Sequence, residues 1–177
     1  MTEEHTLVAL VEDKPGVLNR VASLFRRRNF NIDSLTVGRT NIPGVSRMTI
    51  VVGAGQTASY LVEMNLNKLV NVISVRNVTQ DRTVTRDLAL IKVKADAPAR
   101  AEISQIAEIF RAKIVDVSQS SLIVEVTGTE DKIDSMLELL EPFGIIEMVR
   151  TGRVAMVRGE QSVPPMNGRR PALKSVS

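Results

Sequence analysis

The same order of predicted elements occurs twice along this chain of 177 residues, and this internal repeat constrains the fold more than any other feature. In each half an apolar strand leads into a helix, then come two strands, a second helix and a final strand. The first half predicts strands at 6–11, 32–37, 46–52 and 72–75, and helices at about 16–28 and 58–69. The second half predicts strands at 88–93, 114–117, 122–126 and 145–149, helices at about 98–110 and 129–141, and an extra strand at 154–157. The repeat predicts two βαββαβ units.

This order places the chain in the α+β class, as two tandem ferredoxin-like domains. Because each crossover is right-handed, both helices of a unit lie on one face of a four-stranded antiparallel sheet. Thr6 to Val11 (TLVALV) is nevertheless apolar on both faces. We therefore expect the face away from the helices to be covered, by a second copy of the chain or by a partner protein.

The predicted domains span residues 5–78 and 84–159, and a basic tail follows at 160–177. Prolines, glycines and polar residues dominate the tail, so we expect it to be disordered. From Arg158 onward the charged residues are four cations and Glu160, which together supply the whole net charge of +3. Residues 1–157 are neutral overall, which argues against a nucleic-acid-binding face in spite of a pI of about 9.5.

Most kinds of catalytic chemistry lack their usual residues here. The chain has no cysteine, His5 is its single histidine, and the sequence contains no nucleophile-elbow, P-loop or zinc-protease motif. We expect no catalytic and no metal site, although a small enzyme that uses carboxylates stays open as an alternative. Without a signal-like or membrane-spanning segment, the chain is expected in the cytoplasm.

The turn after the first strand, Asp13-Lys14-Pro15-Gly16-Val17-Leu18, has the chemistry of a small-molecule site. Gly16 removes a side chain where a ligand could approach, and the amides of Val17 and Leu18 at a helix start can hold a carboxylate. Asp13 and the downstream Asn31 could take the ammonium group of a free amino acid. A helix capped by Asp13 in the ordinary way explains the same residues equally well.

These residues also carry a resemblance to a known family. The run VEDKPGVLNRVASLFRRRNFNIDSLTVGRT, followed by SRMTIVV and LNKLVNVISV, resembles the ACT domain of the acetolactate synthase (acetohydroxyacid synthase) small subunit. The second half continues it through ALIKVKA, AEIFRAKIVDVS, VEVTGTEDKIDSMLELL and VRTGRVAMVRG. The resemblance extends from about His5 to Gly159.

The resemblance implies a non-catalytic regulatory subunit of branched-chain amino acid biosynthesis. Such a subunit activates a separate large catalytic subunit and confers feedback inhibition by valine, leucine or isoleucine. Thiamine diphosphate, magnesium and FAD would belong to the large subunit, and none to this chain. ACT domains of the family pair side by side as a homodimer, with the effector at their interface; the implied effector contacts are Asp13, Gly16 and Asn31, beside Val17, Leu18 and Ile32.

A stand-alone amino-acid-sensing transcriptional regulator with an ACT domain is the alternative of a different class. It would need a DNA-reading helix or a basic face, and the neutral residues 1–157 indicate neither.

Overall fold

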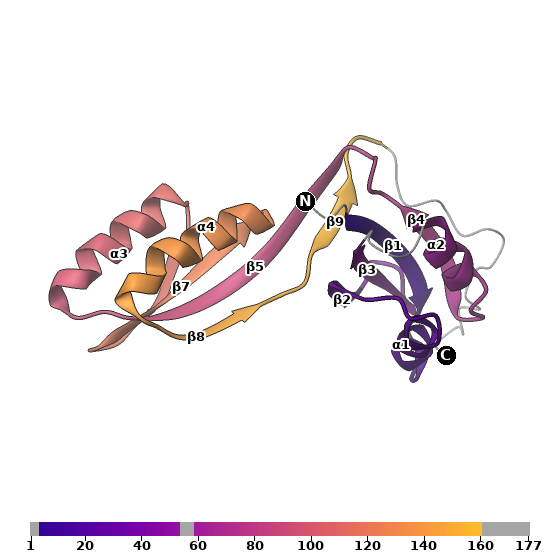
Figure 1. The fold of residues 1–177 in the computed structure, drawn as a ribbon, viewed down its shortest axis with the longest axis horizontal. Coiled ribbons are helices and arrows are strands. Elements are labelled where there is room, and N and C mark those ends of the chain that lie inside the picture. Colours follow the sequence, from indigo (N-terminus) through magenta and orange to yellow (C-terminus); the bar gives the residue numbers. More distant parts are fainter. Residues whose placement is uncertain (1–3, 54–58, 161–177) are drawn as a thin grey trace. The chain divides into compact units, whose positions relative to one another are not determined.

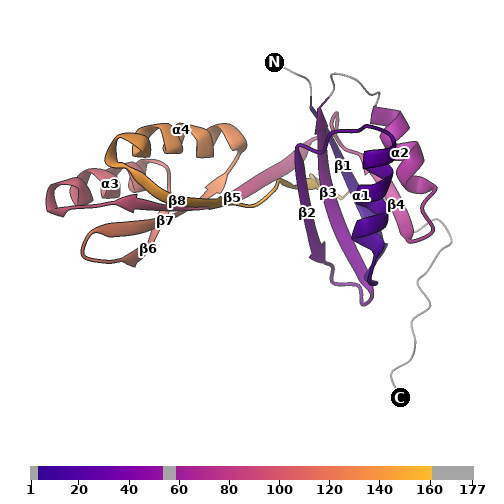
Figure 2. The same cartoon turned by 60° about the horizontal axis from the view of Figure 1, so that its bottom comes forward.

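The computed structural model describes residues 4–53 and 59–160, which form two units drawn in Figures 1 and 2. The first unit runs to Val84, the second spans Thr85–Gly152, and the chain rejoins the first unit from Arg153 onward. Each unit has the predicted βαββαβ order and an antiparallel sheet, so the α+β class and the two ferredoxin-like repeats are confirmed. Among the described residues, no helix is long and apolar enough to cross a membrane.

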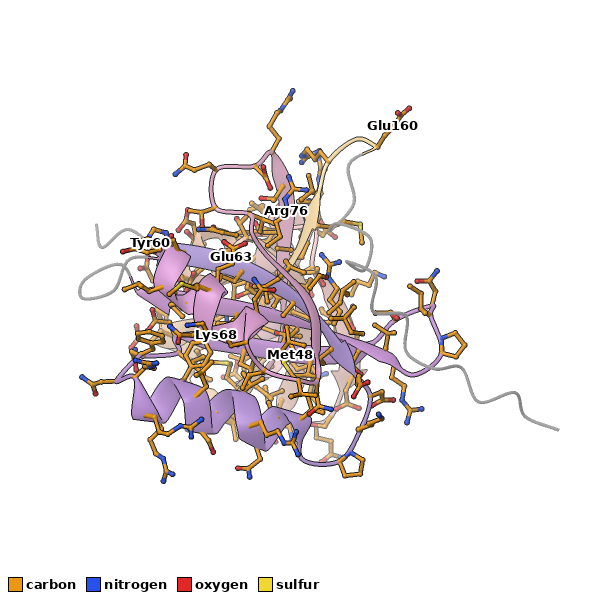
Figure 3. The ribbon with its side chains drawn as sticks, turned by 90° about the vertical axis from the view of Figure 1, so that its right-hand side faces the viewer. Met48, Tyr60, Glu63, Lys68, Arg76 and Glu160 are labelled. Atoms are coloured by element: carbon orange, nitrogen blue, oxygen red, sulfur yellow. The ribbon has the colours of Figure 1, made fainter. Side chains whose placement is uncertain are left out.

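The first unit has a sheet of four strands in the order β2-β3-β1-β4, with α1 and α2 on one face (Figure 2). Its elements are β1 (Glu4–Glu12), α1 (Val17–Arg27), β2 (Ser34–Arg39), β3 (Val45–Gly53), α2 (Ser59–Asn67) and β4 (Val72–Asn77). Met48 of β3 is buried beneath the helices, whereas Tyr60 on α2 is 64% exposed (Figure 3). The core therefore lies between the sheet and one helical layer.

Helix α1 follows directly from its sequence pattern. Val17, Val21, Leu24 and Phe25 recur on one face and are all buried against the sheet. Positive charge in the last turn complements the helix dipole, and Asn29 ends the helix with a left-handed φ of 54°. The Asn29 stop is confirmed. The sequence pattern predicted a stripe of Leu18, Val21, Ala22 and Phe25, which is only partly right, because Val21 and Phe25 are buried whereas Leu18 and Ala22 are exposed.

The opposite face of the first sheet is covered by the chain itself. Strand β9 (Val154–Val157) lies on this face, where Ala155 is packed with Val8 and Val78, next to the half-buried Leu10 and Val157. Val8 is thereby fully buried. The need for a cover was predicted correctly, but the expectation that a second copy or a partner supplies it was wrong for this part of the face, because the C-terminal strand returns to fill it.

The second unit repeats the architecture with the strand order β6-β7-β5-β8. Its elements are β5 (Thr83–Lys94), α3 (Ala97–Ile109), β6 (Lys113–Val117), β7 (Ser121–Gly128), α4 (Glu130–Leu140), the 3-10 turn η1 (Glu141–Phe143) and β8 (Ile145–Arg150). Ile91, Ile103, Val124, Ile133 and Met136 are fully buried between the sheet and its helices. The amphipathic stripes found in the sequence thus form a second, separate core.

Two predicted regions differ from the structure or lie outside it. The compact second unit ends at Gly152, and β9, which lies within the predicted domain of residues 84–159, packs with the first unit; the domain bounds themselves stay a prediction. Ala58, predicted at the start of the second helix, and residues 161–177 of the predicted tail lie outside the described residues.

Candidate functional site

The turn between β1 and α1 presents an uncapped helix start. Gly16 is the N-cap residue, with a left-handed φ of 83°, and no side chain bonds to the first-turn amides. A Cβ placed on Gly16 would meet nothing within 4 Å, so the space beside Gly16 is open. Backbone N–H groups at such a helix start attract an anion. The expectation that Asp13 caps the helix was wrong.

Asp13 is instead tied to the neighbouring hairpin. Its carboxylate lies 3.3 Å from Nε of Arg39, and its backbone N–H donates to the carbonyl of Gly44 at 2.8 Å. Both partners belong to the end of the β2–β3 hairpin, which lies beside the end of β1. The Asp13 carboxylate therefore sits at the rim of the open helix start, where it is 41% exposed.

The side chains of Val17 and Leu18 point in different directions from the turn: Val17 is buried, whereas Leu18 is partly exposed. The Val17 side chain is buried in the first core, and its N–H makes only a long contact of 3.4 Å to the carbonyl of Lys14. The Leu18 side chain is 47% exposed next to the turn. An anion at this turn would thus meet backbone amides from both residues but an apolar side chain only from Leu18.

Asn31 and Ile32 lie at the other end of α1. The 11 residues of α1 rise by about 16 Å between the Gly16 end and the Asn31 end. Asn31 is exposed and its side-chain amide donates to Asp33 at 2.5 Å, whereas Ile32 is half-buried against the first core. Within one chain, the six predicted residues therefore form two groups, and a molecule the size of an amino acid cannot touch both.

A hydrogen-bonded network holds the turn from behind. Glu12 accepts a bond from the Asn71 amide at 2.6 Å, and Asn71 in turn accepts one from Arg20 of α1 at 2.6 Å. The Asn71 bond, together with Lys14 at 3.1 Å, lowers the pKa of Glu12 below its ordinary value. Because the network joins β1, α1 and the loop before β4, it fixes the position of the open helix start.

The equivalent turn of the second unit is closed by its own side chain. Asp96 is the N-cap residue of α3, and its carboxylate accepts a hydrogen bond from the Ala99 amide at 3.0 Å. A cavity of about 590 Å³ lies beside this turn, lined in part by Lys94, Phe143 and Ile146. The anion-ready helix start is therefore a property of the first unit, because in the second unit Asp96 already supplies the negative charge.

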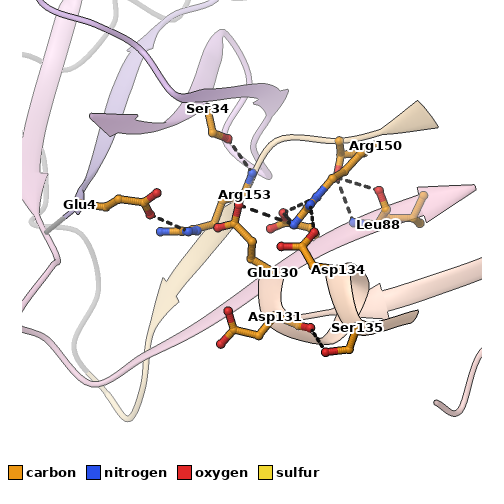
Figure 4. A network of polar contacts seen from close by, with 11 residues as sticks. Glu4, Ser34, Leu88, Glu130, Asp131, Asp134, Ser135, Arg150 and Arg153 are labelled. Carbon is orange, nitrogen blue, oxygen red and sulfur yellow. Dashed lines mark hydrogen bonds and ion pairs between the residues drawn. The ribbon is translucent and has the colours of Figure 1, made fainter. Parts of the chain in front are cut away.

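A second polar cluster, which sequence analysis did not predict, lies in the second unit (Figure 4). The guanidinium of Arg150 pairs with Asp87 at 2.9 Å and with Asp134 at 2.7 Å, and Glu130 lies 3.9 Å away. Burial alone would lower the pKa of Arg150, but the bonds to Asp134 and Asp87 outweigh it and raise the pKa. The cluster ties β5, α4 and β8 together. Among the described residues, no group of three or more histidine, aspartate or glutamate side chains could hold a metal ion.

Comparison with known proteins assigns both units. Residues 7–74 match the family described as "AHAS small subunit-like ACT domain", and residues 86–159 match "Small subunit of acetolactate synthase". The acetolactate synthase small subunit of Mycolicibacterium smegmatis is 51% identical over 162 residues, covering 92% of this chain and 95% of that protein. This chain belongs to the acetolactate synthase small-subunit family. The resemblance seen in the sequence is confirmed.

Further relatives of the small subunit agree over nearly their full length. The probable acetolactate synthase small subunit of Archaeoglobus fulgidus is 52% identical, covering 89% of this chain and 99% of that protein. The crystal structure of the acetolactate synthase small subunit from Thermotoga maritima matches with a TM-score of 0.82 and 42% identity, over 89% of this chain and 99% of that one. As a small subunit, the chain has the role of a regulatory subunit rather than of the catalytic one.

Proposed function

We propose that this small subunit activates the large catalytic subunit of acetolactate synthase and makes it sensitive to feedback inhibition by valine or a related branched-chain amino acid. The large subunit, with thiamine diphosphate, magnesium and FAD, would condense two pyruvates to 2-acetolactate and CO2. Family membership supports the partnership, and the open helix start at Gly16 is the observation that carries the effector site. The chain by itself is expected to form no acetolactate.

The chemistry of the turn suits the acid end of an amino acid. The first-turn amides after Gly16 would bind the carboxylate, Asp13 at the rim would meet the ammonium group, and the exposed Leu18 offers an apolar contact for a branched side chain. No side chain of the turn competes for these amides, in contrast to Asp96 in the second unit.

The separation of Gly16 from Asn31 supports a site shared by two chains. Since about 16 Å of helix lies between them, both can contact one effector only if Gly16 comes from one copy and Asn31 from another. Strand β2 is an edge of the first sheet, and Val37 on it is 43% exposed, so this edge can extend the sheet into a second copy. We therefore propose a homodimer formed through the ACT domains, with the effector at the interface.

Calorimetric titration of valine into the purified subunit tests the site. Gly16→Asp places a carboxylate beside the amides and is expected to weaken binding at least tenfold. Gly159→Asp serves as the matched control, because Gly159 is an exposed glycine after β9 that also has a left-handed φ and open space around it. Equal affinity in the wild type and Gly16→Asp would refute this effector site.

Mixing two inactive variants tests whether the site is shared. Gly16→Asp and Asn31→Ala are each expected to bind weakly alone. A mixed pair would join the intact Gly16 of one chain to the intact Asn31 of the other and recover one site. No recovery after refolding the two variants together would rule out the shared site. Reconstitution with the large subunit, assayed with each branched-chain amino acid, then identifies the effector.

A further inference from the structure

We propose that strand β9 is the element through which effector occupancy of the first unit reaches the rest of the small subunit. The inference rests on the proposed effector site and adds the route by which its occupancy is relayed. It starts from the observation that β9 contacts β1 and β3, and that Arg153, directly before β9, contacts β1 and β2.

The beginning of β9 is anchored at the Asn31 end of the first sheet (Figure 4). The backbone N–H of Arg153 donates to the hydroxyl of Ser34 at 2.9 Å, and its guanidinium pairs with Glu4 at 2.9 Å. The same guanidinium donates to the Thr6 hydroxyl at 3.3 Å. These contacts bind the segment before β9 to the first residues of both β1 and β2.

The Ser34 contact lies three residues from the predicted effector residue Asn31. The Asn31 side chain bonds to Asp33, and the Asp33 backbone N–H donates to the Val51 carbonyl at 2.9 Å. Ser34 is the next residue and begins β2. An effector that pulls on the Asn31 side chain therefore displaces a short, hydrogen-bonded segment whose following residue holds Arg153.

The middle of β9 is held by Arg47 of β3. Its Nη2 donates to the Ala155 carbonyl at 2.7 Å, and Ala155 itself is packed against Val8. Burial lowers the pKa of Arg47, which reflects the cost of desolvating its charge. The hydrogen bond to the Ala155 carbonyl compensates part of that cost. The position of β9 and the position of the Arg47 side chain on β3 therefore depend on each other.

The other end of the same segment is fixed in the second unit. Arg150, at the end of β8, is held by Asp87 and Asp134, and only Thr151 and Gly152 separate it from Arg153. Three successive residues extend by at most about 10 Å. In the proposed relay, a shift of the Arg153 anchor is passed along this short covalent segment to β8, so that β9 would be more than a cover of the first sheet.

Two variants separate the relay from the binding site. Ser34→Ala removes the acceptor for the Arg153 N–H, and Arg47→Met removes the donor to Ala155; Met156→Ala, on the same strand but 66% exposed, is the matched control. For each variant, valine affinity is measured on the complete small subunit by calorimetry. Valine inhibition is measured on the holoenzyme reconstituted with the large subunit.

The expected result is a loss of coupling without a loss of binding. Valine affinity stays within twofold of the wild type. The coupling between valine binding and activity falls by about fivefold for each lost hydrogen bond. This fall in coupling is measured as a higher residual activity at saturating valine. Ser34→Thr keeps the hydroxyl and is expected to restore inhibition, and circular dichroism checks that each variant is folded.

Two results would overturn the relay. One is that folded Ser34→Ala and Arg47→Met subunits are inhibited by valine like the wild type. The other is that valine binding and inhibition fall in parallel, which would assign these residues to the site itself. A wild-type subunit that binds no branched-chain amino acid is a different outcome, because it refutes the proposed effector function before the relay is reached.

Discussion

Replacing Arg150 by methionine is expected to destabilise the second unit strongly. The arginine joins β8 to Asp87 of β5 and Asp134 of α4, and its side chain is 21% exposed. The Asp87 side chain is only 8% exposed, so methionine would leave a carboxylate that is desolvated and has lost its cation. The Asp134 side chain is 49% exposed, so it stays hydrated and the loss of its partner costs little stability.

The magnitude follows from this asymmetry. Breaking a buried ion pair by removing one partner costs about 3–5 kcal/mol, and the partial exposure of Arg150 places the expected loss near the lower limit, at about 3 kcal/mol. For a domain of this size a loss of about 3 kcal/mol lowers the melting temperature by more than about 10 °C. Asp134→Asn, which breaks only an exposed pair, should cost less than about 1 kcal/mol.

Urea unfolding followed by circular dichroism measures these differences, and a double-mutant cycle identifies their origin. Adding Asp87→Asn to Arg150→Met should recover more than half of the loss, because a neutral amide is cheaper to bury than an unpaired carboxylate. If Arg150→Met unfolds within about 1 kcal/mol of the wild type, the desolvated carboxylate is not the cause that we assign.

Two further perturbations test the first unit. The pKa of Glu12 is lowered by Asn71 and Lys14, so its contribution to stability is present above the ordinary value of 4.5 and is lost as the pH falls through the lower, folded-state pKa. Asn71→Leu should therefore be less stable than the wild type at pH 7, and the difference in free energy of unfolding should narrow in urea titrations below pH 4.5. A difference that does not change with pH would contradict this. Gly16→Ala should lower the free energy of unfolding by about 1–2 kcal/mol because of the left-handed φ of 83°. Gly38→Ala should leave it unchanged, because the backbone at Gly38 imposes no such strain. Equal unfolding curves for the two variants would refute the strain argument.

The two repeated folds could be predicted because their signals are local. The helix α1 and the left-handed Asn29 were both predicted from spacing and residue type, although the buried face of α1 contains Val17 and Leu24 in place of the predicted Leu18 and Ala22. The position of β9 was not, since a strand at Val154–Val157 could be predicted without indicating that it pairs with β5 and packs on the open face of the first sheet. Its place depends on Val8 and Arg47, more than 100 residues earlier in the chain.

The candidate site was predicted only in part, for a similar reason. Gly16 and its free amides follow from the local pattern, but Asp13 pairs with Arg39 instead of capping the helix, because the hairpin brings a cation to it. The distance of Asn31 from Gly16 follows only from the length and direction of α1. Spacing in the sequence could not indicate that the two groups of residues lie this far apart.

The packing of β9 on the first sheet also sets the order in which the protein can finish folding during synthesis. The N-terminal unit lacks Ala155, which covers Val8, until the ribosome has made the whole of the second unit. At typical elongation rates, residue 155 follows residue 84 by roughly 4–14 s. The half that is made first is therefore completed last, with an apolar surface that a chaperone can reach throughout that interval.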